Sequence, residues 1–257
     1  MKTQLKGFKK MNKIYKISLL VASLAFMSCE IPADLNDNPN EITVSDVDAN
    51  LFLNGAQLAN VIVQVSHMNR ISGMFSGQLV GYASLYSNIY GYSLSTVESN
   101  DEWSSAYIGV VANTRHIRSS APNDKLLVGI TQVLEAHAMS TLAILTGDVP
   151  FSEVLSNNDA PKFDDQKAVL DGCSTLLSNA ITVLSEASSR SEAYDIYYGG
   201  DKDKWIAAAY TLKARIALIK KDYASALSYA GTGISSSAGD MMYIPRGDAA
   251  TPNGDKN

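Results

Sequence analysis

The chain has 257 residues, and 46% of them are hydrophobic, which is enough for a sizeable core in one large domain or two small ones. Residues 1–28 hold six lysines and no acidic residue, so the remainder carries 15 basic residues against 26 acidic ones, a net charge of −11. An acidic body repels phosphates, which excludes nucleic acid as a partner.

The first 28 residues have the pattern of a secretory signal peptide. Lysines precede the apolar run Ile17–Met27, which is shorter than the roughly 20 residues that a membrane span needs. A start at Met11 instead of Met1 would give this signal a more ordinary length, and the sequence leaves that choice open. The segment ends in Ser28-Cys29, which resembles a bacterial lipobox and predicts that Cys29 is the lipidated first residue of the mature protein. The alternative is an ordinary cleaved signal followed by a chance cysteine.

Residues 29–46 are interpreted as a lipidated tether between the membrane and a folded body, because they are acidic, contain Pro32 and Pro39 and show little periodicity. Several acyl chains on Cys29 would anchor the protein stably, since one chain alone binds a membrane only marginally. The other cysteine, Cys173, falls in phase with the apolar positions of a predicted helix. We therefore expect a buried thiol there and no disulfide framework.

The body begins with two predicted helices. The first covers residues 47–67, and the second, shorter one covers Ile71–Val80. The apolar residues that are expected to form one face of the first helix are Leu51, Leu58, Val61, Ile62 and Val65.

The segment Gly81–Asn100 is rich in tyrosine, serine, glycine and asparagine and is predicted to be a long loop, because its tyrosines lack a clean helical phase. Long loops in compact domains often carry function. Tyrosine combines an apolar ring with a hydroxyl group at low entropic cost, which suits the apolar faces and hydroxyl edges of sugar rings. Three interpretations remain open: binding of a ligand, contact with a partner protein, and packing of the loop onto the body. The candidate binding residues are Tyr82, Tyr86, Tyr90 and Tyr92.

Another helix carries Trp103 and Tyr107, and a long buried helix follows it. The buried helix has apolar residues at the spacing of one helix face between positions 127 and 145, and it ends at the run Gly147–Glu153. Gly147 can close the helix in a left-handed conformation, and Pro150 prevents its continuation.

Three more helices are predicted over about 166–188, 203–220 and 223–230, and the end of the chain is loop-like. The last two, the first of which opens with Trp205, loosely resemble a tetratricopeptide pair. No convincing pair of strands is present. The predicted fold class is therefore all-α: a helical solenoid or bundle with tetratricopeptide-like helix pairs and long decorated loops.

The sequence contains no convincing catalytic or metal-binding constellation. The three histidines are far apart, and none belongs to a cluster with metal-ligand spacing. Glu98, Asp101 and Glu102 offer carboxylates for glycoside hydrolysis, but nothing sets their separation. A nucleophile elbow and a phosphate-binding glycine loop are both missing. We therefore expect no enzyme activity and no metal.

Five short runs occur in a fixed order along the chain. They are Ser28-Cys29 with Leu35–Asn40, Asp101-x-Trp103 with Tyr107 and Asn113, Gly147–Glu153, Pro161–Gln166, and Tyr198–Asp201 with Lys204-Trp205 and Leu212–Arg215. Together they resemble the SusD/RagB family of nutrient-binding outer-membrane lipoproteins, specifically its SusD-like branch. One departure is Tyr210-Thr211, where a typical member has Asn-Ser. The structural signature residues of the resemblance are Trp103, Tyr107, Gly147, Asp148, Pro150, Trp205 and Arg215.

The resemblance implies a lipid-anchored protein of the outer membrane that is exposed at the cell surface. Such proteins capture oligosaccharides, or peptides in some members, and close as a lid over a SusC-like TonB-dependent transporter. They are not enzymes and need no cofactor. Members are about twice this length, so residues 47–257 are expected to be the N-terminal portion of a single α-helical domain whose C-terminal half is absent.

Two other functions are alternatives to this one. A helical-repeat scaffold that binds only protein shares the solenoid and differs in having no small ligand. A lipid-anchored hydrolase is disfavoured because no nucleophile and base, and no carboxylate pair, can be identified. The runs that carry the resemblance are mainly scaffold signatures, so the ligand-binding hypothesis depends on the four tyrosines.

Overall fold

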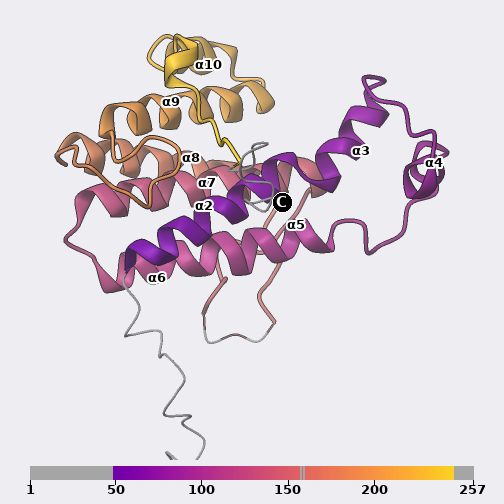
Figure 1. Cartoon of the computed structure of the whole chain (residues 1–257), viewed down its shortest axis with the longest axis horizontal. Coiled ribbons are helices and arrows are strands. Elements are labelled where there is room, and N and C mark those ends of the chain that lie inside the picture. Colours follow the sequence, from indigo (N-terminus) through magenta and orange to yellow (C-terminus); the bar gives the residue numbers. More distant parts are fainter. Residues whose placement is uncertain (1–48, 157, 159, 246–257) are drawn as a thin grey trace, which may run out of the picture. The chain divides into compact units, whose positions relative to one another are not determined.

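The computed structural model describes residues 49–156, 158 and 160–245 (Figure 1). The chain divides into two units, Met1–Asp46 and Val47–Asn257, and the described residues belong to the second. The predicted signal peptide, the tether and Cys29 lie outside the described residues and remain predictions.

The described residues are helical, as predicted, and their extended pairing is limited to one bridge between Val149 and Asp164. In chain order the helices are α2 (Ala49–Val65), α3 (His67–Phe75), α4 (Ser84–Tyr90), α5 (Asn100–Ser104), the π-helix η4 (Ser105–Ala112), α6 (Asn113–Ser120), α7 (Lys125–Thr146), α8 (Gln166–Ser185), α9 (Lys202–Ile219), α10 (Tyr223–Ala230) and the short 3-10 helix η5 (Ser237–Gly239).

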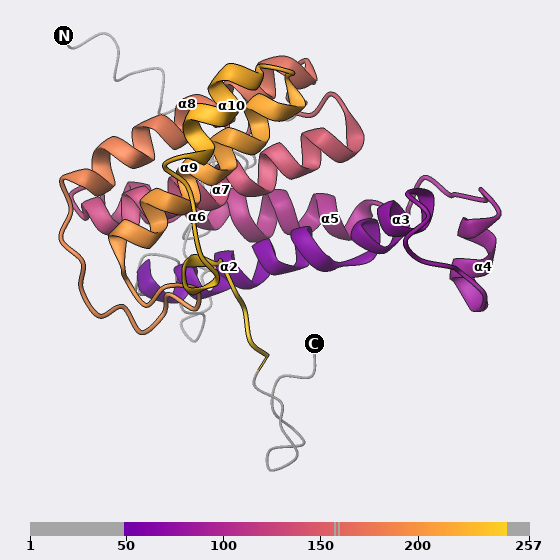
Figure 2. The ribbon, with the colours of Figure 1, turned by 90° about the horizontal axis from the view of Figure 1, so that it is seen from above.

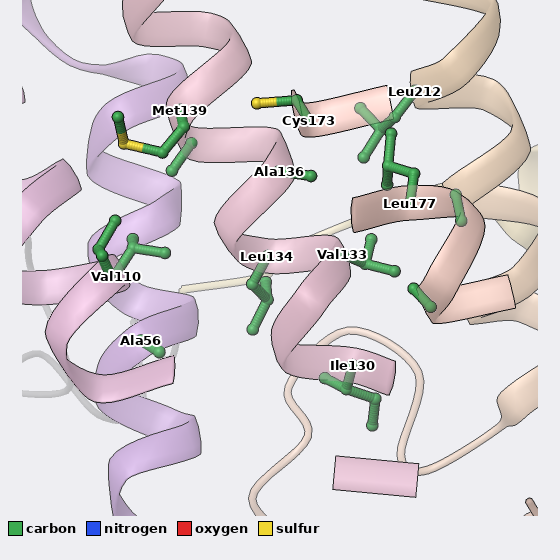
Figure 3. Packing of buried hydrophobic residues seen from close by; sticks show 14 of the residues in the cluster. Ala56, Val110, Ile130, Val133, Leu134, Ala136, Met139, Cys173, Leu177 and Leu212 are labelled. Carbon is green, nitrogen blue, oxygen red and sulfur yellow. The ribbon is translucent and has the colours of Figure 1, made fainter. Parts of the chain in front are cut away.

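Helix α7 is the centre of the core. It contacts α2, α6, α8, α9 and η4, and buried side chains surround it on several sides. Figure 3 shows Val133 on the side of α7 that faces Leu177 of α8, whereas Met139 lies on the opposite side, towards Val110 of η4. Helix α7 is long and apolar enough to cross a membrane, but 78% of its most apolar window is buried, as in the core helix of a globular protein. The predicted long buried helix is therefore confirmed.

The ends of these helices follow from local side-chain chemistry. Asp124, Asp165, Asp201 and Asp222 each precede a helix and accept hydrogen bonds from backbone N–H groups of its first turn. Gly147 closes α7 with φ of 90°, and its N–H donates to the carbonyl oxygen of Ala143.

Helices α7, α8, α9 and α10 stack side by side, each on its neighbour in sequence (Figures 1 and 2). Helices α9 and α10 form the predicted tetratricopeptide-like pair, joined by a tight turn in which Lys221 has φ of 62°. Cys173 is buried in α8, as its phase predicted, and it is a free cysteine.

The prediction for the buried face of α2 is wrong. Most of the expected apolar residues lie on its exposed side, among them Leu51 and Val65, and the buried residues are Leu53, Ala56, Gln57, Ala59, Asn60 and Val63. Small residues allow α2 and η4 to approach closely here. A Cβ added at Gly109 of η4 would lie 2.4 Å from the Cβ of Ala59 in α2, so only glycine fits at position 109. The buried amides are tolerated because both have hydrogen-bond partners.

The predicted loop over Gly81–Asn100 is also partly wrong, because it contains α4. Tyr82, Tyr86 and Tyr90 are four residues apart, which is a helical spacing, but the glycines and serines around them outweighed it. The preceding helix, α3, begins at His67 and ends at Phe75, four to five residues earlier than predicted at both ends.

Candidate functional site

We call residues 67–99 the tyrosine arm. It comprises α3, α4 and the segment that leads to α5, and both views show α3 and α4 apart from the stack of α7 to α10 (Figures 1 and 2). The arm has a small core of its own, in which Ile71, Met74 and Ile89 are buried and Met68 and Tyr86 pack against them. It is therefore a distinct cluster beside the main core.

Two glutamates hold the base of the arm. The fully buried carboxylate of Glu102 accepts hydrogen bonds from Ser66 Oγ at 2.5 Å and from the backbone N–H of Met68 at 2.9 Å. Glu98 lies 2.7 Å from Nε2 of His67, and this hydrogen bond lowers the pKa of the glutamate. Glu102 thus connects α5 to the start of α3, and Glu98 connects the segment before α5 to α3, which is a structural role for two of the residues considered for hydrolysis.

The arm contains a pocket of about 340 Å³. The residues that line it are Arg70, Met74, Leu79, Val80, Gly81, Tyr82, Ala83 and Tyr86. Glycine is required at position 81 because a Cβ there would lie 2.0 Å from the carbonyl oxygen of Tyr86. The walls are largely apolar, and Arg70 supplies a charged group at the lining.

The structure brings two of the four predicted tyrosines into this pocket. Tyr82 is 89% exposed, so its ring is available to a ligand, whereas Tyr86 is partly buried. The hydroxyl group of Tyr86 accepts a hydrogen bond from Nε of Arg70 and lies 3.1 Å from Nδ1 of His67. These contacts hold the Tyr86 ring in one orientation.

The other two tyrosines lie on the arm outside the pocket lining. Tyr92 is exposed and stacks on Phe75, with ring centroids 5.4 Å apart and planes 13° from parallel. Tyr90 is partly exposed at the end of α4. Of the predicted set, Tyr82 and Tyr86 therefore remain the pocket candidates.

Sequence reasoning missed Arg70 as a pocket residue. The available signal was charge: between His67 and Ser99 the only other side chain with a formal charge is Glu98. An isolated arginine among apolar and tyrosine residues stands out in an acidic chain, but only the fold shows that it lies beside Tyr82 and Tyr86.

The first signature residues brace the turn between α7 and α8. Tyr107 donates a hydrogen bond to the carbonyl oxygen of Pro150 at 2.7 Å, and burial raises the pKa of its hydroxyl group. Trp103 packs in a tilted arrangement against Tyr107. Asp148 accepts a hydrogen bond from the backbone N–H of Gln166 at the start of α8.

The remaining signature residues lie around α9. Trp205 is fully buried, and its Nε1 donates to Asp195 at 2.8 Å. Asp195, which sequence reasoning missed, also accepts from the backbone N–H groups of Tyr197, Tyr198 and Gly200. Arg215 is exposed and donates to Thr141 of α7 at 3.4 Å.

A second cavity of about 370 Å³ lies between α2, α7 and the segment 241–245. Its polar side chains include Gln64, His137 and Tyr197, and each has a hydrogen-bond partner on a neighbouring element. Desolvation and the charge of Arg215 lower the pKa of His137 to about 3, so its imidazole is neutral. The arm pocket differs because Arg70 retains terminal N–H groups that bond to no other described residue.

The described part of the chain has no group of three or more His, Cys, Asp or Glu that could hold a metal ion.

The comparisons with known proteins identify the family. The family model described as "SusD-like_2: Starch-binding associating with outer membrane" matches residues 39–241. No curated protein matches the chain.

Several solved structures share the fold. A SusD/RagB family protein from Bacteroides thetaiotaomicron has a TM-score of 0.69 and 21% identity, with 76% of this chain and 44% of that chain covered. A chitin-binding protein has a TM-score of 0.62 and 22% identity, with 76% and 46% covered. A chitin-binding SusD homologue from Flavobacterium johnsoniae has a TM-score of 0.55 and 20% identity, with 72% and 42% covered. This chain therefore spans less than half the length of each.

The family match covers well over half of the chain, and the helical architecture agrees with it. The chain belongs to the SusD-like family, whose members are described as starch-binding and associating with the outer membrane.

Proposed function

We propose that this protein is a nutrient-binding lipoprotein of the cell surface, which captures oligosaccharides and delivers them as a lid to a SusC-like TonB-dependent transporter of the outer membrane. Membership of a family described as starch-binding supports the ligand class, and chitin-binding proteins among the structural neighbours are consistent with it. The proposal includes binding without turnover, and it needs no cofactor.

The observation that carries the proposal is the pocket of the tyrosine arm. Tyr82 offers an exposed ring at its lining, and Tyr86 is held in place by His67 and Arg70. An aromatic ring can pack against the apolar face of a sugar while polar groups bind its hydroxyls. Ligand pockets typically measure about 300–1,000 Å³. At about 340 Å³, this one suits one sugar ring of an oligosaccharide better than a longer segment.

The binding test replaces Tyr82 with alanine in the purified chain. We expect affinity for a bound oligosaccharide to fall by about tenfold or more, because a tyrosine that anchors a ligand commonly contributes over about 1.4 kcal/mol. Titration calorimetry or affinity electrophoresis on a glycan panel measures the change.

The matched control is Tyr223→Ala, which removes an equally large exposed ring from α10, remote from the arm. Its affinity should equal that of the unaltered chain. If Tyr82→Ala binds every glycan as well as Tyr223→Ala does, the arm pocket is not the binding site.

Peptide binding at the same pocket is the alternative within the family, and a scaffold that binds only protein is the alternative outside it. One observation favours the scaffold: α10 buries no side chain and exposes Tyr223 and Leu227 at 65% and 78%. An exposed apolar surface of this kind can contact another protein. A scaffold predicts that Tyr223→Ala weakens recovery of a partner from membranes and that no glycan or peptide binds.

A further inference from the structure

We propose that the ligand of the arm pocket carries an acidic group, a carboxylate or a sulfate, and that Arg70 is the residue that recognises it. This inference rests on the proposed ligand-binding function and narrows it to acidic oligosaccharides. It is carried by four observations: the charges of the arm, the unused donors of Arg70, the hydrogen bonds that orient it and the apolar walls around it.

Arg70 has no ion-pair partner within the arm. The only acidic residue of the arm, Glu98, is 2.7 Å from His67, and it forms no ion pair with Arg70. Within the described residues Arg70 has no carboxylate partner at all, although acidic residues far outnumber basic ones after residue 28. Arg115, Arg118 and Arg190 each pair with a carboxylate of the chain, whereas Arg70 lies at a pocket lining without one, so the acidic group of a ligand is a suitable partner for it.

The guanidinium group has donors to spare. Its Nε donates to the hydroxyl oxygen of Tyr86, and the four N–H groups on its terminal nitrogens have no acceptor among the described residues. These four donors lie in one plane as a fork that matches the two oxygens of a carboxylate or a sulfate. A neutral sugar hydroxyl has no charge and only one oxygen, so it forms a weaker contact with this fork.

A chain of hydrogen bonds orients this fork. Glu98 accepts from Nε2 of His67, so Nδ1 is left to accept from the hydroxyl group of Tyr86, whose oxygen in turn accepts from Arg70. His67 and Tyr86, in the middle of this chain, then each donate one hydrogen bond and accept another, and the bonds reinforce one another. The Arg70 side chain also lies over the Tyr86 ring, with its guanidinium carbon 5.7 Å from the ring centroid. Its terminal nitrogens are therefore held beside the pocket before any ligand arrives.

The walls of the pocket strengthen a charged contact. Met74, Leu79 and Val80 form an apolar wall on one side, and an ion pair becomes stronger where a bound ligand displaces water from such a wall and lowers the local dielectric constant. The exposed ring of Tyr82 suits the apolar face of a sugar that carries the acidic group. The shared chemistry is an oxyanion, and its two sources are a uronic acid and a sulfated sugar.

The test compares acidic and neutral oligosaccharides on the purified chain. Oligogalacturonides supply carboxylates, carrageenan oligosaccharides supply sulfates, and malto- and chito-oligosaccharides are neutral. We expect at least one acidic series to bind more tightly than the neutral ones. Arg70→Gln should weaken that binding by about tenfold or more, because a hydrogen bond between charged groups exceeds a neutral one. Its effect on a neutral oligosaccharide should stay within about twofold.

Two controls separate the role of Arg70 from general effects. Lys167→Gln removes the same charge from α8, where the lysine is exposed at 73%, and it should leave all affinities unchanged. Tyr86→Phe removes the hydroxyl group that orients Arg70 but keeps the guanidinium, so it should cost less affinity than Arg70→Gln. Circular dichroism checks that each variant is folded.

Each outcome decides the inference. Tighter binding of an acidic series with a selective loss in Arg70→Gln supports it. Equal binding of neutral and acidic sugars, equal losses in Arg70→Gln for both, or equal losses in Lys167→Gln overturn it while leaving the proposed function intact. Tighter binding of a glutamate-rich peptide overturns the choice of a sugar. Failure of every glycan to bind would overturn the proposed function as well.

Discussion

Single buried carboxylates connect segments that are far apart in this sequence. Asp195 accepts hydrogen bonds from three backbone N–H groups of the loop before α9 and from the indole N–H of Trp205 in α9. Glu102 accepts from the backbone at the start of α3, and Glu135 pairs with both Arg115 and Arg118 of α6. Asp195 and Glu135 accept hydrogen bonds on both carboxylate oxygens, which is the condition under which burial of a charge is tolerated, whereas the buried Oε2 of Glu102 has no partner among the described residues. At the scale of one residue, these carboxylates therefore connect elements of the fold by hydrogen bonds, in addition to the hydrophobic packing around them.

Replacement of Asp195 with alanine should lower the free energy of unfolding by about 3 kcal/mol, because three backbone N–H groups and the indole N–H of Trp205 would lose their acceptor inside the protein. Urea denaturation followed by circular dichroism measures the loss. Asp203→Ala, at an exposed carboxylate in the first turn of α9, should cost less than about 1 kcal/mol. Equal losses in the two variants would contradict this role for Asp195.

At the scale of the element, helix periodicity predicted where helices lie better than which face is buried. Helix α2 shows the reason: its buried face carries two alanines and two amides, Gln57 and Asn60, and its exposed face carries Leu51 and Ile62. Periodic hydrophobic residues identify a helix, but they do not fix its buried face. A face of small residues and hydrogen-bonded amides can pack against a neighbouring helix more closely than a face of large apolar residues. The helix of the arm, α4, was missed for a related reason, since seven residues give a weak periodic signal.

The local stability of the arm should depend on pH. The hydrogen bond from His67 lowers the pKa of Glu98, so the contribution of this contact is present above the ordinary glutamate pKa of about 4.3 and is lost as pH falls through the lowered value. The protection of the α3 and α4 amides against hydrogen exchange, corrected for the intrinsic exchange rate at each pH, should therefore fall below about pH 4, before that of the α7 amides.

His67→Ala is the variant that tests this contact. The Glu98 pKa, followed by carbon NMR of the carboxyl group, should rise towards its ordinary value, while that of Glu186, which Lys125 lowers on the main body, should stay unchanged. An unchanged Glu98 titration in this variant would show that His67 is not the cause of the shift.

At the scale of the whole molecule, the proposed function requires attachment to the membrane through Cys29, which lies outside the described residues. Replacement of Cys29 with serine should move the protein from the membrane fraction to the soluble fraction and abolish incorporation of labelled palmitate, because two or more acyl chains supply the stable anchor. Cys173→Ala is the matched control, since this cysteine is buried in α8 and its loss should leave the labelling unchanged. Palmitate incorporation that persists in Cys29→Ser would contradict the assignment.

The amino-acid sequence by itself determined the all-α class, the long buried helix with its stop at Gly147 and the family, because helix periodicity and turn residues are local properties. Only the tertiary structure decided which face of α2 is buried and which tyrosines share a pocket with Arg70. Those outcomes depend on close approach between elements distant in sequence, such as Gly109 against Ala59, and on hydrogen bonds such as that from Nε of Arg70 to Tyr86. No local pattern encodes such contacts, since they arise only when packed helices bring the side chains together.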